Sequence, residues 1–290
     1  MPNHDLIVIG GGTAGLTAAI HAASSGRSVL VIDRMGGGGE LMNLGPLREV
    51  ETQTDGPDLA AELLTEAISA GAELRVAEVT GLSQTPAGWR VTAGDETHSA
   101  RAVIAATGLA HGTLGLADEP AWEGHGLSHC AACDGPLFSG QPVVVAGGGR
   151  WARQDAIDLA AFASKVTLIN DEDVTPVIEG ITVVRGRVAA LEGQDGLDTV
   201  LVETAGAIIR IPARGVFVQT RRRADTGFAP AGLARDPDGR LITNDALETN
   251  LPNLFAAGDA RAGAQYTIAA AMGDGRQTAI SALGKIAEKE

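Results

Sequence analysis

Cys130 and Cys133 are the only cysteines of the chain, and two alanines separate them. Thiols at this spacing can close a small disulfide ring, and such pairs favour the thiolate, which is the attacking species. Asp134 follows directly, where it could exchange protons with a sulfur. A zinc site needs two further ligands, and only His125 and His129 lie close by, so we expect no metal. The spacing predicts thiol–disulfide chemistry; the alternative is two half-buried cysteines without a redox role.

A glycine loop near the start of the chain is typical of dinucleotide binding. It follows the apolar run Leu6–Ile9 and satisfies G-x-G-x-x-G through Gly10, Gly12 and Gly15. The first glycine permits a tight turn, the second lets the backbone approach a pyrophosphate, and the third allows close packing of helix on strand. The motif leaves the dinucleotide unspecified, and a glycine turn needed only for packing is the alternative.

Two further features complete this first site. Thr13 and Ala14 stand inside the loop, where the exposed N–H groups of a helix N-terminus would hold the pyrophosphate. Asp33 ends the next apolar run, which is the usual position of an acid that binds ribose hydroxyls.

A second glycine loop recurs in the middle of the chain. Gly147 and Gly149 follow the apolar run Pro142–Ala146 and, with Ala152, fit G-x-G-x-x-A. Trp151 stands inside this loop, at the predicted start of a helix.

The elements around both loops predict an α/β protein with two Rossmann-like dinucleotide-binding domains. For the first loop we expect helices over 14–25 and 59–70 and strands over 28–32, 73–79, 89–92 and 102–105. For the second we expect a helix over 151–163 and a strand over 165–169. We expect a last strand and turn at 254–259, followed by a helix over 267–287. If this last strand joins the first sheet, the second domain is inserted into the first. The predicted domains are then 1–113 with 244–290, and 114–243.

The chain resembles the low-molecular-weight thioredoxin reductase family along essentially its full length. The stretches that carry the resemblance are Ile7–Gly15, Gly38–Leu41, Ala106–Gly108, Cys130–Gly135, Gly147–Gly149 and Phe255–Asp259. The resemblance implies FAD in the first site and normally NADPH in the inserted domain. It implies that Cys133 is the flavin-proximal sulfur, Cys130 the thiol that meets the substrate, and Asp134 the acid/base residue. It also implies a homodimer. The further residues that it assigns to FAD are Gly39, Glu40, Leu41, Thr107, Gly108, Gly258, Asp259 and Thr267.

The second site departs from the family pattern in two places. Relatives carry a small or polar residue where this chain has Trp151, and an indole there would crowd a pyrophosphate or stack on another planar ring. Relatives also carry arginines that clasp the 2′-phosphate of NADPH, where this chain reads Asn170, Asp171, Glu172 and Asp173. Acids repel that phosphate, so we expect NADPH to be a poor donor.

Three other interpretations of these departures stay open. The acids could bind the ribose of NADH, Arg221–Arg223 could supply the missing charge, and Trp151 could pack in the core. Some relatives without the arginines use ferredoxin or another flavin as donor.

Composition limits which classes of partner the protein can have. The formal charge of −14 makes nucleic acid an unsuitable partner, and no apolar run approaches the length of a membrane span. The absence of such a run favours a cytoplasmic protein. Together with the cysteine pair, the family resemblance implies an enzyme that passes electrons between FAD and the disulfide of a thioredoxin-like protein or a small molecule. The alternatives are a flavin-dependent dithiol oxidase that uses oxygen, and a flavin-binding redox sensor without turnover.

Overall fold

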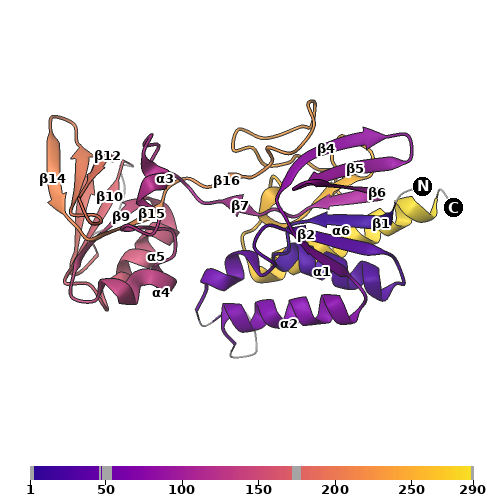
Figure 1. Cartoon of the computed structure of the whole chain (residues 1–290), viewed down its shortest axis with the longest axis horizontal. Helices are drawn as coiled ribbons and strands as arrows, with labels where there is room; N and C mark the ends of the chain where they lie inside the picture. The colour runs from indigo at the N-terminus through magenta and orange to yellow at the C-terminus, as the bar shows by residue number, and fades with distance from the viewer. Residues whose placement is uncertain (1–2, 46, 48–53, 172–177, 289–290) are drawn as a thin grey trace. The chain divides into compact units, whose positions relative to one another are not determined.

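The computed structural model describes residues 3–45, 47, 54–171 and 178–288. It divides into two compact units, one formed by Met1–Ala110 with Arg223–Glu290 and the other by His111–Arg222. Each unit is built on its own largely parallel sheet (Figure 1), so the predicted α/β fold class is confirmed.

The first unit contains a seven-stranded sheet in the order β3-β2-β1-β6-β5-β4, with β17 paired to β6. The bounds of these strands are Glu73–Val76 (β3), Val29–Asp33 (β2), His4–Ile9 (β1), Glu96–Ala105 (β6), Gly88–Ala93 (β5), Val79–Thr85 (β4) and Leu254–Ala256 (β17). Strands β3, β2, β1, β6 and β17 run parallel to one another, whereas β4–β5–β6 is an antiparallel meander. Because the β1–β2 and β1–β6 pairs are parallel, the carboxyl ends of these strands meet at one edge of the sheet.

Three helices cover one face of this sheet, namely α1 (Thr13–Ser24), α2 (Gly56–Ser69) and α6 (Ile268–Ala287) (Figure 1). Alanines of α1 and α6 and leucines of α2 pack there on buried strand residues such as Val8, Val31 and Ile104. The other face buries Trp89 together with Phe228, Leu233 and Leu241.

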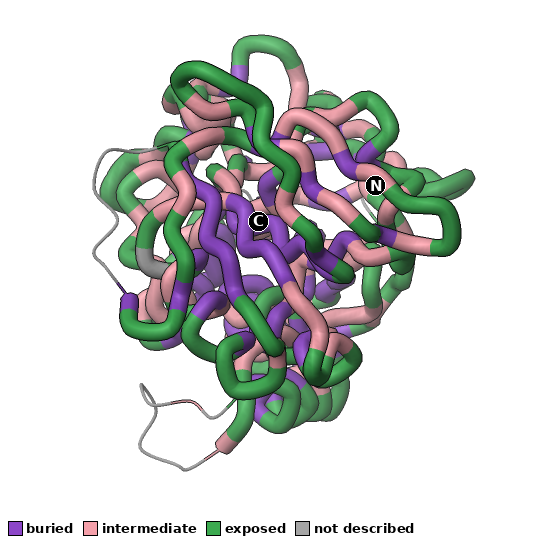
Figure 2. The backbone as a smooth tube through the Cα atoms, turned by 90° about the vertical axis from the view of Figure 1, so that its left-hand side faces the viewer, coloured by how far each residue is buried: buried purple, intermediate pink, exposed green. Residues whose placement is uncertain are grey.

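The inserted unit holds a five-stranded parallel sheet in the order β11-β10-β9-β15-β8. The bounds are Ile181–Arg185 (β11), Lys165–Asn170 (β10), Pro142–Gly147 (β9), Gly215–Gln219 (β15) and Leu127–Ser128 (β8). Helix α5 (Gly149–Leu159) packs on one face, and a small antiparallel sheet packs on the other, formed by β12 (Arg187–Glu192), β13 (Thr199–Glu203) and β14 (Ile208–Pro212). Figure 2 shows the buried strand segments in purple, with exposed turns in green around them.

Short elements complete the chain. They are β7 (Leu109–Ala110), β16 (Arg223–Ala224), α3 (Glu119–Trp122), α4 (Ala131–Asp134) and the 3₁₀ turns η1 (Gly39–Asn43), η2 (Gly135–Phe138) and η3 (Gly258–Ala260).

The return to the first unit comes earlier than the sequence led us to expect. The chain rejoins that unit at Arg223, whereas the predicted boundary is residue 244; the insertion begins at His111 instead of residue 114. The physical reason is that β16 pairs with β7, and that Phe228, Leu233 and Leu241 bury their side chains in the core of the first unit.

Candidate active site

The first glycine loop lies at the carboxyl edge of the first sheet, between β1 and α1. Gly10 has a φ of 100°, and a Cβ there would stand 2.4 Å from the carbonyl oxygen of Ala106. A Cβ on Gly15 would stand 1.9 Å from the carbonyl oxygen of Gly10, so only glycine lets α1 pack this closely against the loop. These contacts explain why both positions lack a side chain.

Gly12 lacks a side chain for a different reason. It is the N-cap of α1 with a φ of −80°, which any residue adopts, and a Cβ there would meet only the Cα of Gly39, at 3.9 Å. A Cβ on Gly39 would in turn stand 3.1 Å from the Cα of Gly12. Two bare glycines thus face each other at the N-terminus of α1, next to its exposed N–H groups. This cradle fits a pyrophosphate that approaches the backbone.

The carboxylate of Asp33 accepts three backbone N–H groups next to this cradle. One carboxylate oxygen accepts the N–H of Gly11 at 2.8 Å, and the other accepts the N–H groups of Met35 at 2.8 Å and Gly37 at 3.0 Å. Asp33 therefore has a structural role that the sequence did not indicate, and it lies at the strand end where a ribose would be expected.

The other residues assigned to FAD lie around the same sheet edge, with differing exposure. Thr13 and Ala14 begin α1, with Ala14 buried. Glu40 is exposed in η1, whereas the side chain of Leu41 is buried in the core under α2. Leu41 can therefore present only its backbone to a ligand.

Two of the assigned residues follow strand β6. Thr107 Oγ1 donates to the carbonyl of Asp225 at 3.0 Å, and Gly108 has a φ of 64°. Apart from its two chain neighbours, no residue that the structure describes comes within 4 Å of the position that a Cβ on Gly108 would take, so this side of the loop is open among those residues.

The last predicted segment, at Gly258 and Asp259, follows β17 and lies against the first turn of α1. A Cβ on Gly258 would stand 2.9 Å from the Cβ of Ala14. Asp274 of α6 holds this turn, because its carboxylate accepts the N–H of Gly258 at 3.1 Å and binds Arg261 through both oxygens. Asp274 and Arg261 belong to no motif, and the sequence analysis missed them.

Thr267 and Tyr266 stand at the start of α6. Thr267 Oγ1 accepts the N–H of Ala270 at 3.2 Å and so caps the helix. Tyr266 has a φ of 54°, which is unusual for a bulky residue. Its ring lies 5.2 Å from the guanidinium of Arg240, and burial raises the pKa of its hydroxyl although Arg240 opposes the shift.

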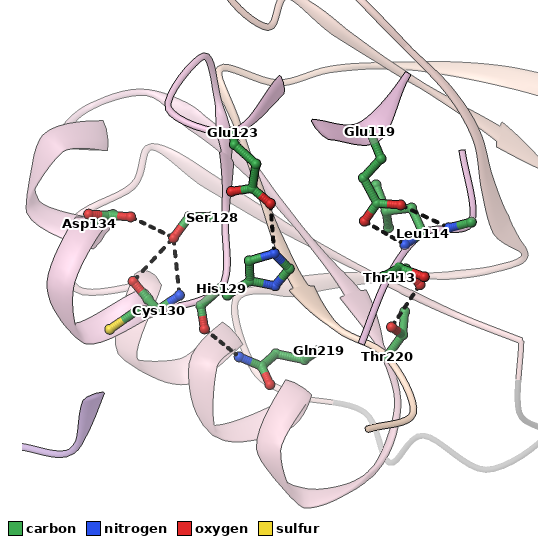
Figure 3. A network of polar contacts seen from close by, with 11 residues as sticks. Thr113, Leu114, Glu119, Glu123, Ser128, His129, Cys130, Asp134, Gln219 and Thr220 are labelled. Atoms are coloured by element: carbon green, nitrogen blue, oxygen red, sulfur yellow. Dashed lines mark hydrogen bonds and ion pairs between the residues drawn. The ribbon is translucent and has the colours of Figure 1, made fainter. Parts of the chain in front are cut away.

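The redox pair is positioned by β8 and α4 in the inserted unit. Cys130 and Cys133 form a disulfide, and the N–H of Cys133 points at the sulfur of Cys130 at 3.1 Å. Ser128, buried at the end of β8, donates from Oγ to Oδ2 of Asp134 at 2.7 Å and accepts the N–H of Cys130 at 3.1 Å (Figure 3). One hydroxyl thus fixes both the cysteine turn and the predicted acid/base residue. Sequence reasoning missed Ser128, although it stands only two residues before Cys130.

The second glycine loop has the backbone of a nucleotide site. A Cβ on Gly147 would stand 2.0 Å from the carbonyl oxygen of Gln219, Gly149 has a φ of 75°, and Ala152 in α5 is fully buried. Trp151 is 42% exposed, so the interpretation that it packs in the core is wrong.

A polar cluster lies beside this loop. At the end of β15, the buried side chain of Gln219 donates from Nε2 to Oδ2 of Asp155 in α5 at 2.6 Å, and its Oε1 accepts a hydrogen bond from the guanidinium of Arg222 at 3.1 Å. Asp171 is exposed just past the end of β10, while Glu172 and Asp173 lie outside the described residues.

Comparisons with known proteins agree with this geometry. A model of the family described as pyridine nucleotide-disulphide oxidoreductase matches residues 4–275. The thioredoxin reductase of Listeria innocua is 34% identical over 292 residues, which cover 94% of this chain and 90% of that protein.

Solved structures give the same result. The thioredoxin reductase of Lactococcus lactis superposes with a TM-score of 0.90 at 27% identity and covers 99% of this chain and 100% of that one. A ferredoxin-flavin thioredoxin reductase of Clostridium acetobutylicum gives a TM-score of 0.57 at 26% identity and covers 98% of each chain. Within the described residues, no helix has the length and apolar character needed to cross a lipid bilayer. The chain belongs to the pyridine nucleotide-disulphide oxidoreductase family, and within it the chain is a thioredoxin reductase-like disulfide oxidoreductase.

Proposed function

We propose that this enzyme uses FAD to reduce the disulfide of a thioredoxin-like protein or a small molecule through Cys130 and Cys133. The observation that carries the proposal is the Cys130–Cys133 disulfide beside Asp134, whose carboxylate Ser128 holds in place. The thioredoxin reductases among the relatives support a thioredoxin-like partner.

The exchange follows from the properties of the two thiols. The Cys130 thiolate attacks one sulfur of the substrate disulfide, and the other substrate sulfur leaves as a thiolate that takes a proton. The Cys133 thiolate then attacks Cys130 in the mixed disulfide, which releases the second substrate thiol and restores the Cys130–Cys133 disulfide. The substrate gains two electrons and two protons, and Asp134 is the nearest carboxyl group in the sequence to carry one of these protons.

The first site fits FAD through the cradle described above. Its pyrophosphate would rest on the backbone at Gly12 and Gly39, with ribose hydroxyls at Asp33 and the ribityl chain near Asp259. When bound, the flavin supplies the two electrons that return the cysteine pair to its dithiol form.

We also propose that NADPH is a poor electron donor. The exposed Trp151 in the first turn of α5 stands where an incoming pyrophosphate would lie, and Asp171 presents negative charge to a 2′-phosphate. Gln219, Asp155 and Arg222 form a polar cluster at the carboxyl end of β15, and the carboxyl ends of the strands are where a doubly wound sheet takes its ligand. A ferredoxin or another flavin is the alternative donor, and the clostridial ferredoxin-flavin thioredoxin reductase supports it.

One rapid-mixing experiment tests both proposals. The yellow protein is mixed anaerobically with NADPH, NADH, reduced ferredoxin or a dithiol, and the loss of flavin absorbance is followed. We expect reduction by the dithiol and by ferredoxin, and slow or no reduction by NADPH. Rapid reduction at micromolar NADPH would contradict the donor proposal and would direct attention to Arg221–Arg223 as the phosphate site.

A variant series adds a control. Trp151→Ala, Asp171→Arg and the double variant are compared, because arginine alone should recover little NADPH reactivity while the indole remains.

The cytoplasmic location and the homodimer expected from the sequence stay predictions, and analytical ultracentrifugation tests the second.

A further inference from the structure

A buried amide at the end of β15, the side chain of Gln219, is joined to the redox turn. Its Nε2 donates to Oδ2 of Asp155 at 2.6 Å and to the carbonyl of His129 at 3.3 Å (Figure 3). Its Oε1 accepts a hydrogen bond from the guanidinium of Arg222 at 3.1 Å. Both N–H groups and the oxygen of the amide are therefore used, and they link β15 and α5 to the chain just before the cysteine pair.

The peptide unit between His129 and Cys130 is held at both of its polar atoms. Its carbonyl oxygen accepts the hydrogen bond from Gln219, and its N–H, which belongs to Cys130, donates to Oγ of Ser128 at 3.1 Å. Because a peptide unit is planar, two hydrogen bonds at its opposite atoms fix how it is rotated about the chain. That rotation sets the φ of Cys130, which is −134°. The direction in which the sulfur of Cys130 leaves the backbone is therefore fixed from two sides.

A polar side chain at the end of this strand is not what the core requires. Residues 216–218 of β15 are apolar and buried, and an apolar residue at the next position would continue that core. A buried amide costs free energy unless its polar atoms are paired. Here the carboxylate of Asp155 and the guanidinium of Arg222 orient the amide of Gln219, so the hydrogen bond to His129 comes from a fixed donor.

We propose that Gln219 is a positioning residue for thiol–disulfide exchange, which holds Cys130 in the orientation that closes the ring with Cys133. The inference rests on the proposed function, because it takes this cysteine pair as the group that exchanges with the substrate. Closing the ring breaks two S–H bonds and forms the S–S bond, and two electrons and two protons pass to the reacting partner. A turn that is already oriented raises the effective concentration of one thiol at the other, so the disulfide forms more readily.

The equilibrium of the cysteine pair with dithiothreitol measures this effect. The FAD-loaded protein is incubated anaerobically at a series of ratios of reduced to oxidised dithiothreitol, the thiols are trapped by alkylation, and the dithiol fraction is measured by mass spectrometry. Reduction of the pair takes two electrons and two protons from dithiothreitol, which closes to its cyclic disulfide. Flavin absorbance is recorded in the same samples, and urea unfolding gives the stability of each variant.

Four variants separate positioning from a merely structural role. Gln219→Met removes the side-chain hydrogen bonds and nearly keeps the volume. Asp155→Ala removes the anchor of the amide, whereas Asp155→Asn is the conservative variant, because its amide oxygen can still accept the hydrogen bond from Gln219. Thr220→Val is the matched control: the next residue along the chain also donates to a main-chain carbonyl, from Oγ1 to Thr113 at 2.9 Å, but that carbonyl lies outside the redox turn.

We expect Gln219→Met to lower the equilibrium constant for disulfide formation about three- to tenfold, which raises the reduction potential by about 14–30 mV. Asp155→Ala should act in the same direction, and it carries the test if Gln219→Met does not fold. Asp155→Asn should stay close to the wild type, and Thr220→Val should leave the equilibrium unchanged even where it lowers the free energy of unfolding.

An unchanged equilibrium constant in Gln219→Met, or an equal shift in Thr220→Val, would overturn the inference. A cysteine pair that exchanges with dithiothreitol but not with the flavin would contradict only the proposed function, so the two failures are distinguishable.

Discussion

Replacing Gly12 with alanine should remove FAD and leave the fold intact. The backbone at Gly12 suits alanine, and the new Cβ would meet only the Cα of Gly39 at an ordinary 3.9 Å. Alanine is a poorer N-cap than glycine by about 0.5–1 kcal/mol, but it also lowers the entropy of the unfolded chain by a similar amount. We therefore expect the free energy of unfolding to change by less than about 1 kcal/mol.

The effect on the cofactor should be much larger. The added methyl group projects into the cradle between the two glycines, where the pyrophosphate would approach the N–H groups of α1. Each charge-assisted hydrogen bond is worth about 1.5–3 kcal/mol. Loss of two such bonds would cost about 3–6 kcal/mol, so the Kd for FAD should rise by about 10²- to 10⁴-fold.

The assay compares flavin content and stability in the same preparations. Flavin absorbance per chain is measured after gel filtration, the apoprotein is titrated with FAD, and urea unfolding is followed for each variant. Gly284→Ala is the matched control, because its Cβ would meet nothing and it lies near the far end of α6. Gly15→Ala is the opposite case: its Cβ would stand 1.9 Å from a carbonyl oxygen, so it should damage the fold itself. A Gly12→Ala protein that binds FAD as tightly as the wild type would refute the placement of the pyrophosphate.

Three further predictions concern the thiols, the turn that holds them and the only tyrosine. Cys133→Ser should abolish electron exchange between flavin and disulfide while FAD stays bound. Cys130→Ser should leave the Cys133 thiolate, which then perturbs the flavin spectrum as an electron donor. Identical spectra of the two reduced variants would count against Cys133 as the sulfur next to the flavin. Ser128→Ala should lower the free energy of unfolding by about 1–3 kcal/mol, because the N–H of Cys130 and the carboxylate of Asp134 lose their partner, and the exposed Ser139→Ala should change it little in urea melts. The hydroxyl of Tyr266 should ionise above the ordinary pKa of 10.0, because burial raises its pKa. The stability that this shift contributes is present below pH 10.0 and is lost as the pH rises through the raised pKa. An ultraviolet titration of this single tyrosine measures the pKa, and ionisation at the ordinary value would contradict the prediction.

Much of the fold was predictable because glycine loops and apolar runs are local signals. The strand expected at 6–9 is observed as β1 and the helix expected over 267–287 as α6, within a few residues at each end. The three-stranded sheet β12–β14 was not foreseen, although Asp195 and Gly196 lie in the turn between β12 and β13 and are typical of a hairpin turn. The boundary at Arg223 was missed because residues 223–243 carry few regular elements, and only tertiary packing assigns them to the first unit.

The site was predictable in residue types but less so in roles. Cys130 and Cys133 form a disulfide and the glycines lie in the two strand–helix loops, whereas Asp33 and Thr267 make hydrogen bonds within the fold. The ligand contacts expected of these residues stay predictions. Ser128, Asp274 and Arg261 were missed because a single residue that holds a turn through space leaves no spacing pattern in the sequence. The exposure of Trp151 likewise depends on which face of α5 it occupies, and a buried and an exposed position differ there by a fraction of a helical turn.

The central claim, that the cysteine pair exchanges electrons with bound flavin, is tested most directly by an anaerobic reductive titration of the purified protein. The flavin and the disulfide are each two-electron acceptors, so the wild-type chain should take up about four electrons before its spectrum stops changing. The variant that carries both Cys130→Ser and Cys133→Ser should take up about two. A wild-type endpoint at two electrons, equal to that of the double variant, would contradict the account.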